Sequence, residues 1–248
     1  MKRILIVGGA NGIGLAIAQE MAERTDCERV YVVDKAPLDA AYAHPKIQSF
    51  EFDLTSDDYS FFDRFYDIDA LMLTAGFGRL ARFRDVREEE IEASFRVNTI
   101  ATMRLIRRFY ARLESTETFR CGVMCSIAGF LSSPFFSVYA ATKAALRIFI
   151  ESVNVELLKG GSTNQILNVS PGSIAGTKFS NPDAQNQLDQ TRPLAAEIIA
   201  HLEQGDDIFI PHYDDIYHNV LERYHNDFRA EGSHSYDYKV QTGRAEKA

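Results

Sequence analysis

A glycine-rich turn near the N-terminus constrains the fold of this chain more than any other feature. An apolar run at residues 3–7 is followed by GGANGIG, and apolar residues then recur at helical spacing from residue 15 to residue 24. The pattern predicts a strand, a tight turn and a helix in immediate succession. Gly8, Gly12 and Gly14 would lie at this junction, where missing side chains let another group approach the backbone closely.

The alternation of strand and helix continues along the chain. Further strand-like runs occupy residues 29–33, 47–52, 69–73, 121–126, 165–170 and 208–210. Helical apolar spacing marks residues 56–65, 88–113, 137–158 and 194–202. Such a series predicts β-α-β units on a parallel sheet. We therefore expect an α/β fold in which residues 1–248 form a single domain. Its Rossmann-type, doubly wound parallel sheet would have about seven strands, with helices on both faces.

Two later segments lack a clear pattern. Residues 178–192 are polar and turn-rich, and together with the helix that follows they suggest a substrate lid over about 178–205. From residue 231 to 248 the chain is polar and largely without apolar periodicity, although Tyr236 and Tyr238 could dock elsewhere. We expect a partly ordered polar tail there.

Composition excludes several classes of protein. Hydrophobic residues make up 46% of the chain, but no apolar run approaches the roughly 20 residues of a membrane-spanning helix. A net charge of -8 without a basic stripe argues against a nucleic-acid partner. The three cysteines, Cys27, Cys121 and Cys125, do not suggest a disulfide framework, and no signal peptide is evident. We expect a cytoplasmic protein.

The cysteines and histidines do not suggest a metal site. On an extended strand Cys121 and Cys125 would lie about 13 Å apart, too far to share an ion. The spacing of His212, His218 and His225 matches no standard ligand motif. We expect Cys125 to be a buried thiol that points away from the face used by its neighbour in sequence.

The glycine turn alone is consistent with cofactor binding or with plain turn chemistry, because its GxxxGxG spacing differs from GxGxxG. Asp34 favours the first interpretation. It ends the second strand-like run about 20 residues on, where a carboxylate binds the adenosine ribose hydroxyls. That carboxylate would repel a 2′-phosphate, and Asn11 supplies no cation, so NAD is favoured over NADP. Lys35 is the dissenting residue, since its ammonium could reach a phosphate. Asp34 could also be simply a solvated residue at a strand end.

Tyr139 and Lys143 form the strongest chemical pair in the sequence. They are four positions apart on one predicted helix, so they share a face. A cation beside a phenol lowers its pKa toward the range in which an acid/base catalyst works best. Ser126, at the end of a strand 13 residues earlier, would lie across the same crevice. A Tyr-x-x-x-Lys pair also occurs by chance on the surface of many helices.

Taken together, these motifs resemble the short-chain dehydrogenase/reductase family. The resemblance spans residues 3 to about 177 and rests on the glycine turn, Asp53, Thr74-Ala75-Gly76, Asn98, Ser126, Tyr139-x-x-x-Lys143 and Pro171-Gly172-x-x-x-x-Thr177. It implies that Tyr139 exchanges a proton with the substrate oxygen and that Ser126 orients this oxygen. Lys143 would hold the nicotinamide ribose, and Asn98 would position a water in a proton relay.

The resemblance also implies a set of cofactor contacts. Beneath the pyrophosphate would lie Gly8, Asn11, Gly12, Ile13 and Gly14, and Asp34 would meet the adenosine ribose. The remaining contacts would come from Asp53 and Leu54 at the adenine, Ala75 and Gly76 beneath the adenosine ribose, and Tyr139, Lys143, Pro171, Gly172, Ile174 and Thr177 around the nicotinamide. Asp53 has a second interpretation, since Asp before Leu-Thr also suits the start of a helix.

Some positions depart from the family pattern. Val7 stands where Thr usually opens the glycine motif, and Leu73-Thr74 replaces Asn-Asn. These changes put the hydrogen bonding of the sheet near the cofactor in doubt more than the chemistry. The familiar closing segment is also missing, and residues 211–248 show little resemblance.

The leading functional hypothesis is an NAD-linked alcohol dehydrogenase or ketone reductase that acts on a small alcohol or carbonyl substrate. If Phe77, Phe130, Leu131, Phe135 and Phe136 line the pocket, the substrate carries an apolar part, but these residues could equally be loop packing. A second hypothesis is a nucleotide-sensing protein without turnover. The presence of Asn98, Ser126, Tyr139 and Lys143 argues against it, because an enzyme that has lost its activity often lacks one of them. A nucleotide-sugar epimerase usually needs a larger C-terminal domain. The helices at 88–113 and 137–158 resemble those through which family members form homodimers, or homotetramers built from such dimers.

Overall fold

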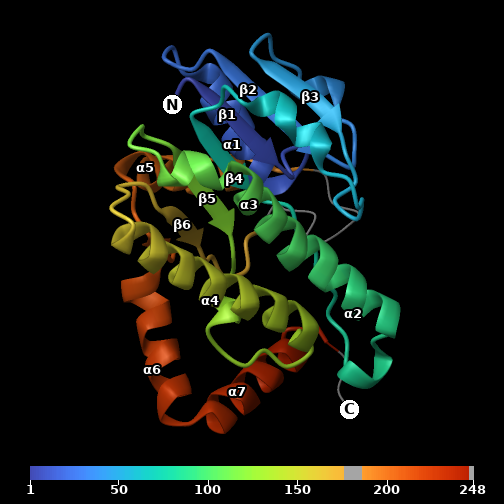
Figure 1. The fold of residues 1–248 in the computed structure, drawn as a ribbon. Coiled ribbons are helices and arrows are strands. Elements are labelled where there is room, and N and C mark those ends of the chain that lie inside the picture. Colours follow the sequence, from blue (N-terminus) through green and yellow to red (C-terminus); the bar gives the residue numbers. More distant parts are fainter. Residues whose placement is uncertain (176–185, 246–248) are drawn as a thin grey trace.

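Short apolar strands lie side by side in one parallel sheet at the centre of the molecule (Figure 1). The computed structural model describes residues 1–175 and 186–245. Over these residues the sheet has seven strands in the order β3-β2-β1-β4-β5-β6-β7. The strands are β1 (Arg3–Val7), β2 (Arg29–Asp34), β3 (Ile47–Glu51), β4 (Ala70–Leu73), β5 (Arg120–Met124), β6 (Ile166–Val169) and β7 (Ile208–Phe209). The predicted fold class is therefore confirmed.

Helices cover both faces of the sheet, which is why the central strands are apolar on both sides. On one face α1 (Gly12–Glu23) packs against α5 (Leu188–Gln204). Their buried side chains, among them Met21 and Ile198, join one core cluster. On the other face α3 (Ala101–Glu114) and α4 (Ser137–Lys159) contribute Leu105 and Leu146 to a second cluster.

The strand order changes direction between β1 and β4, and the chain is tightly joined there. Thr74 follows β4, and its hydroxyl donates to the carbonyl oxygens of Val7 and Gly8 at 3.0 and 2.9 Å. Gly8 N donates to Val33 O at 2.7 Å. Thr74 thus bonds the glycine turn directly, which removes the doubt that its departure from the family pattern raised. In open α/β sheets, ligands bind in the crevice at such a switch point.

The predicted helix over residues 88–113 is interrupted. The structure has α2 (Glu88–Phe95), a π-helical turn (Arg96–Ile100) and then α3. Such a turn inserts an extra residue into the helix and is frequent at functional sites. The predicted helix at 56–65 is also shorter than expected, because only Ser60–Phe65 forms a 3-10 helix.

The prediction of a partly ordered tail from residue 231 onward needs correction, because this polar segment is helical as far as Gln241. A π-helical turn (Tyr213–Tyr217) leads into α6 (His218–Asn226), and α7 (Phe228–Gln241) follows. Asp227 caps α7 by accepting from the backbone N–H groups of Arg229 and Ala230 at 3.0 and 3.1 Å. Glu231 is buried and pairs with Arg223 at 2.7 Å. Polar contacts stabilise this helix, and apolar periodicity does not reveal them.

The interpretation of residues 178–205 as a lid also needs correction. Residues 178–185 lie outside the described residues, whereas Leu188–Gln204 form α5 and pack on the sheet. No helix within 1–175 or 186–245 combines the length and apolar character needed to cross a membrane.

We expect Gly8→Ala to destabilise the protein far more than Gly161→Ala. Both glycines have positive φ, +90° and +84°, so each substitution forces an L-residue into a left-handed conformation that costs about 1–2 kcal/mol. A Cβ at Gly8 would also lie 2.4 Å from Ala75 N, whereas nothing lies within 4 Å at Gly161. That overpacking adds about 1–3 kcal/mol. Urea denaturation of the two variants measures the difference, and equal losses would contradict the close approach at Gly8.

Candidate active site

The fold brings Ser126, Tyr139 and Lys143 together, as the sequence predicts. Ser126 follows β5 and caps the short helix Ile127–Gly129, accepting from Ala128 N at 3.1 Å. Tyr139 and Lys143 lie one turn apart on α4. The side chains of Tyr139 and Ser126 are hydrogen-bond partners. The Lys143 Nζ lies 5.7 Å from the centroid of the Tyr139 ring.

Lys143 is only 3% exposed and donates to Met124 O at 2.7 Å. The position of Gly76 helps to make room for this ammonium, since a Cβ there would lie 3.4 Å from Nζ and 3.3 Å from Asn98 Oδ1. Burial lowers the pKa of Lys143, because the low-dielectric interior penalises the charged form.

The acidity of Tyr139 differs from the expectation. Burial raises the pKa of Tyr139 to about 12, and the hydrogen bond from Ser126 opposes this shift. We expected Lys143 to lower that pKa, but its amine is itself buried and bonded to Met124 O. In this form of the site the phenol is neutral at physiological pH.

Asn98 lies in the π-helical turn and is fully buried. Its Nδ2 donates to Phe77 O at 2.8 Å and to Thr142 Oγ1 at 3.1 Å, and its Oδ1 accepts from Phe77 N at 2.9 Å. Asn98 therefore fixes the backbone after Gly76 and ties it to α4. These contacts place Asn98 beside α4, the helix that carries Tyr139 and Lys143.

The glycine turn fits a pyrophosphate. The first turn of α1 contains no acidic residue, and the side chain of Asn11 does not cap it, so the partial positive charge of the helix N-terminus is available to an anion. A Cβ on Gly14 would lie 2.3 Å from Gly8 O, so only glycine allows this compact turn. Gly12 N donates to Asn186 Oδ1 at 2.8 Å. Ile13 follows in the same turn.

Asp34 lies beside this turn at the end of β2. Its carboxylate accepts from Ala10 N at 3.1 Å and from Ala36 N at 3.2 Å. The carboxylate is thus held against the backbone of the glycine turn. Lys35 is exposed, and its charge helps to lower the pKa of Asp53, after the larger effect of the hydrogen bonds from Thr55.

The remaining predicted cofactor contacts vary in their setting. Asp53 is exposed and closes a tight turn by accepting from Thr55 N and Thr55 Oγ1, both at 2.8 Å. Leu54 and Ala75 pack against the core cluster that contains Leu105, and Ile174 packs against the one that contains Met21. Pro171 O accepts from Ile127 N at 3.0 Å. A Cβ on Gly172 would overlap the hydroxyl of Tyr217. Thr177 lies outside the described residues.

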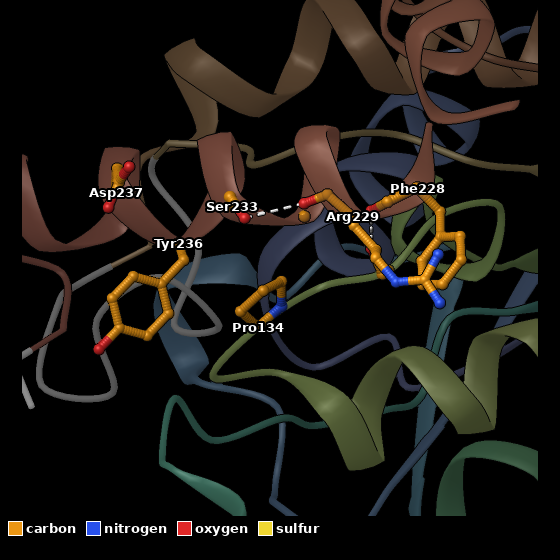
Figure 2. Close-up of a pocket in the computed structure, with 8 residues that line it drawn as sticks. Pro134, Phe228, Arg229, Ser233, Tyr236 and Asp237 are labelled. Atoms are coloured by element: carbon orange, nitrogen blue, oxygen red, sulfur yellow. Dashed lines mark hydrogen bonds between the residues drawn. The ribbon is translucent and has the colours of Figure 1, made fainter. Parts of the chain in front are cut away.

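A cleft of about 210 Å³ opens beside Tyr139 and is lined mainly by carbon. Phe77 and Phe135 line it, so these two aromatic residues belong to the pocket. Phe136 packs against the Tyr139 ring with centroids 4.9 Å apart, and the Arg147 guanidinium carbon lies 4.8 Å from the centroid of the Phe130 ring. A larger groove of about 640 Å³ runs along α7 (Figure 2). Its lining residues include none of Ser126, Tyr139 and Lys143.

The other sequence expectations about reactive groups concern the cysteines. All three are free and buried. Cys125 packs into a core cluster, and burial raises its pKa to about 12. The prediction of a buried thiol at this position is confirmed.

Sequence reasoning missed Asn186, which bonds both Gly12 N and Asn11 Oδ1, the second at 3.3 Å. No signal pointed to it, because Asn186 lies 174 positions from Gly12 in a polar, aperiodic stretch.

Comparison with known proteins agrees with this geometry. The sequence profile of the short chain dehydrogenase family matches residues 2–188. An uncharacterized oxidoreductase of Saccharomyces cerevisiae is 26% identical over 216 residues, which span 82% of this chain and 65% of the yeast protein. A short chain dehydrogenase from Burkholderia cenocepacia, solved in complex with NADP, superposes with a TM-score of 0.77 at 22% identity, covering 95% of this chain and 99% of that one.

A second solved structure, a short chain dehydrogenase/reductase from Burkholderia phymatum in complex with NAD, gives a TM-score of 0.75 at 18% identity and covers 93% and 95% of the two chains. At these identities the solved structures establish the likeness of the fold, while the sequence profile covers most of this chain. The chain therefore belongs to the short-chain dehydrogenase/reductase family of NAD(P)-dependent oxidoreductases.

Proposed function

We propose that this chain uses NAD to move a hydride between nicotinamide and an alcohol or ketone carbon, with Tyr139 as the general acid/base. The observation that carries the proposal is the hydrogen-bonded pair of Tyr139 and Ser126, with Tyr139 lining a cleft of about 210 Å³. A carbonyl oxygen placed between the two hydroxyls would meet a proton donor and a hydrogen-bond donor together.

The chain's own residues would manage the proton while the bound nicotinamide supplies or accepts the hydride. With a pKa of about 12, the phenol of Tyr139 is protonated at neutral pH, which is the form that donates a proton to a carbonyl oxygen. Ser126 orients that oxygen, and Lys143 supports the nicotinamide ribose. In the oxidative direction the same phenol must first lose its proton, so burial works against oxidation in this form of the site.

The proposed substrate is a small alcohol or ketone with an apolar part, because Phe77, Phe135 and Val138 line the cleft beside Tyr139. Such a wall stabilises apolar substituents by excluding water from them. We also propose a cytoplasmic location, since the free, buried cysteines suit a reducing compartment.

We expect NAD to bind more tightly than NADP, and Asp34→Asn to narrow the difference. Ala10 N and Ala36 N bond different oxygens of the Asp34 carboxylate. Asparagine therefore keeps only one of these two acceptors, but it removes the charge that would repel a 2′-phosphate. Near a surface that repulsion amounts to about 1–4 kcal/mol at 4 Å, so the ratio of affinities should fall at least about fivefold. Titration calorimetry with each dinucleotide measures both constants without a substrate. Equal affinities in the wild type would remove the role given to Asp34.

We also propose a homodimer, or a tetramer built from such dimers. On the outer side of α4, Ile148, Val155 and Leu158 are 51%, 57% and 69% exposed. Ile148 and Val155 are seven positions apart and therefore share a stripe, and exposed apolar stripes commonly mark interfaces. Light scattering should give a mass of at least twice 28.0 kDa, and I148K combined with V155K should reduce it. A wild-type mass of 28.0 kDa would contradict this assembly.

Tyr139→Phe should abolish turnover and leave NAD affinity nearly unchanged, because it removes one hydroxyl and keeps the ring. Loss of a general acid typically costs about 10²–10⁴ in rate. The matched control is Tyr66→Phe, at a site 78% exposed and remote in sequence. Steady-state rates on a panel of ketones and secondary alcohols, followed at the nicotinamide absorbance, provide the measurement. If Tyr139→Phe kept more than about a tenth of the wild-type rate, the phenol would not be the main proton donor.

A further inference from the structure

Four consecutive residues of the loop before α4 contact α7, far away in the sequence. Ser132 Oγ donates to Phe228 O at 3.5 Å and lies so near Gly232 that a Cβ there would approach it to 3.0 Å. The next three residues of the loop, 133–135, contact the side chains of Tyr236 and Lys239 on α7. These two lie three positions apart, so they share a face of the helix.

Lys239 binds the middle of this loop. Its Nζ donates to Pro134 O at 2.8 Å, to Ser133 Oγ at 3.0 Å and to Ser235 Oγ on its own helix at 3.2 Å. An ammonium has three protons, so these contacts use its full donor capacity. Lys239 therefore acts as a fixed crosslink between α7 and the loop.

Tyr236 holds Phe135, which has an unusual backbone conformation. Phe135 is a non-glycine residue with φ of +64°, a left-handed conformation that costs about 1–2 kcal/mol and persists only when surrounding contacts fix it. Its ring stacks on Tyr236 with centroids 4.6 Å apart, and its carbonyl oxygen accepts from Ala81 N at 2.8 Å. Figure 2 shows the Tyr236 ring and Pro134 on the same side of α7.

Phe135 joins α7 to the chemistry. It lines the cleft that also contains Tyr139, and the next residue, Phe136, packs against the Tyr139 ring. Neither Tyr236 nor Lys239 is among the residues that line this cleft. Both therefore affect its shape only through the loop that they hold.

We propose that Tyr236 and Lys239 are positioning residues for substrate recognition, which hold Phe135 as a wall of the cleft and so limit the size of the substituent accepted beside Tyr139. The proposal rests on the proposed function for its link to substrate, but not for the link between α7 and the loop. It identifies α7 as the element that sets substrate size in this chain.

Hydrogen exchange tests the structural link without any substrate. Peptides covering residues 130–136 should exchange faster in Tyr236→Ala and Lys239→Met than in the wild type. Tyr236→Phe keeps the stacked ring and should restore slow exchange. Tyr238→Ala, at a half-exposed tyrosine of the same helix, is the matched control and should leave the loop unchanged. Unchanged exchange in both Tyr236→Ala and Lys239→Met, with α7 intact by circular dichroism, would overturn the proposal.

Substrate selectivity tests whether Tyr236 and Lys239 limit the size of the substituent accepted beside Tyr139. Across a series of aryl alkyl ketones with lengthening alkyl chains, Tyr236→Ala should raise kcat/KM for the bulkiest relative to the smallest at least about tenfold, the scale on which a pocket discriminates one methylene. The KM values should change more than kcat, and NADH affinity should stay constant. An unchanged ratio despite faster loop exchange would overturn the role in size selection. If the wild type reduced no ketone or aldehyde at all, the proposed function would fail while the exchange result still stood.

Discussion

The contact between the glycine turn and the end of β4 is the constraint on which the site depends. Gly8 lies so close to Ala75 that no side chain fits between them, and the Thr74 hydroxyl bonds the carbonyl oxygens of Val7 and Gly8 at the start of the turn. This joint fixes the start of α1 relative to the strand that precedes Gly76. Because Asn98 and Lys143 both approach Gly76, the same contact connects the expected cofactor turn to the candidate catalytic residues.

Much of this arrangement could be predicted from the sequence, because local patterns encode it. Strand and helix periodicities predicted the parallel sheet. The spacing of four residues between Tyr139 and Lys143 was enough to predict that they share one face of a helix. The turn at Gly8, Gly12 and Gly14 was recognisable because glycine is required where φ is positive or backbones meet. Residue types at element boundaries carried most of the information about the site.

What could not be predicted depends on contacts distant in sequence. Helix α7 has no apolar stripe, and its contacts with the rest of the fold are polar. The buried Glu231 pairs with Arg223 on α6, and Lys239 bonds Pro134, 105 positions earlier. The pKa of Tyr139 depends on burial, which no i, i+4 spacing reveals. Both Tyr139 and Lys143 lose solvent on folding, and this loss opposes the effect that the charge of Lys143 would have on the phenol. The π-helical turn at Asn98 likewise interrupts a periodicity that looked continuous.

The amide of Asn186 at the N-terminus of α1 has a thermodynamic consequence. Gly12 N is already satisfied by an acceptor from the same chain, so an arriving pyrophosphate exchanges one hydrogen-bond partner for another. The heat of association would then contain the difference between a charged and a neutral acceptor, since charge-assisted hydrogen bonds are roughly twice as strong. The turn would therefore bind an anionic ligand in preference to an uncharged one, because only the anion forms a stronger bond to Gly12 N than the Asn186 amide that it replaces.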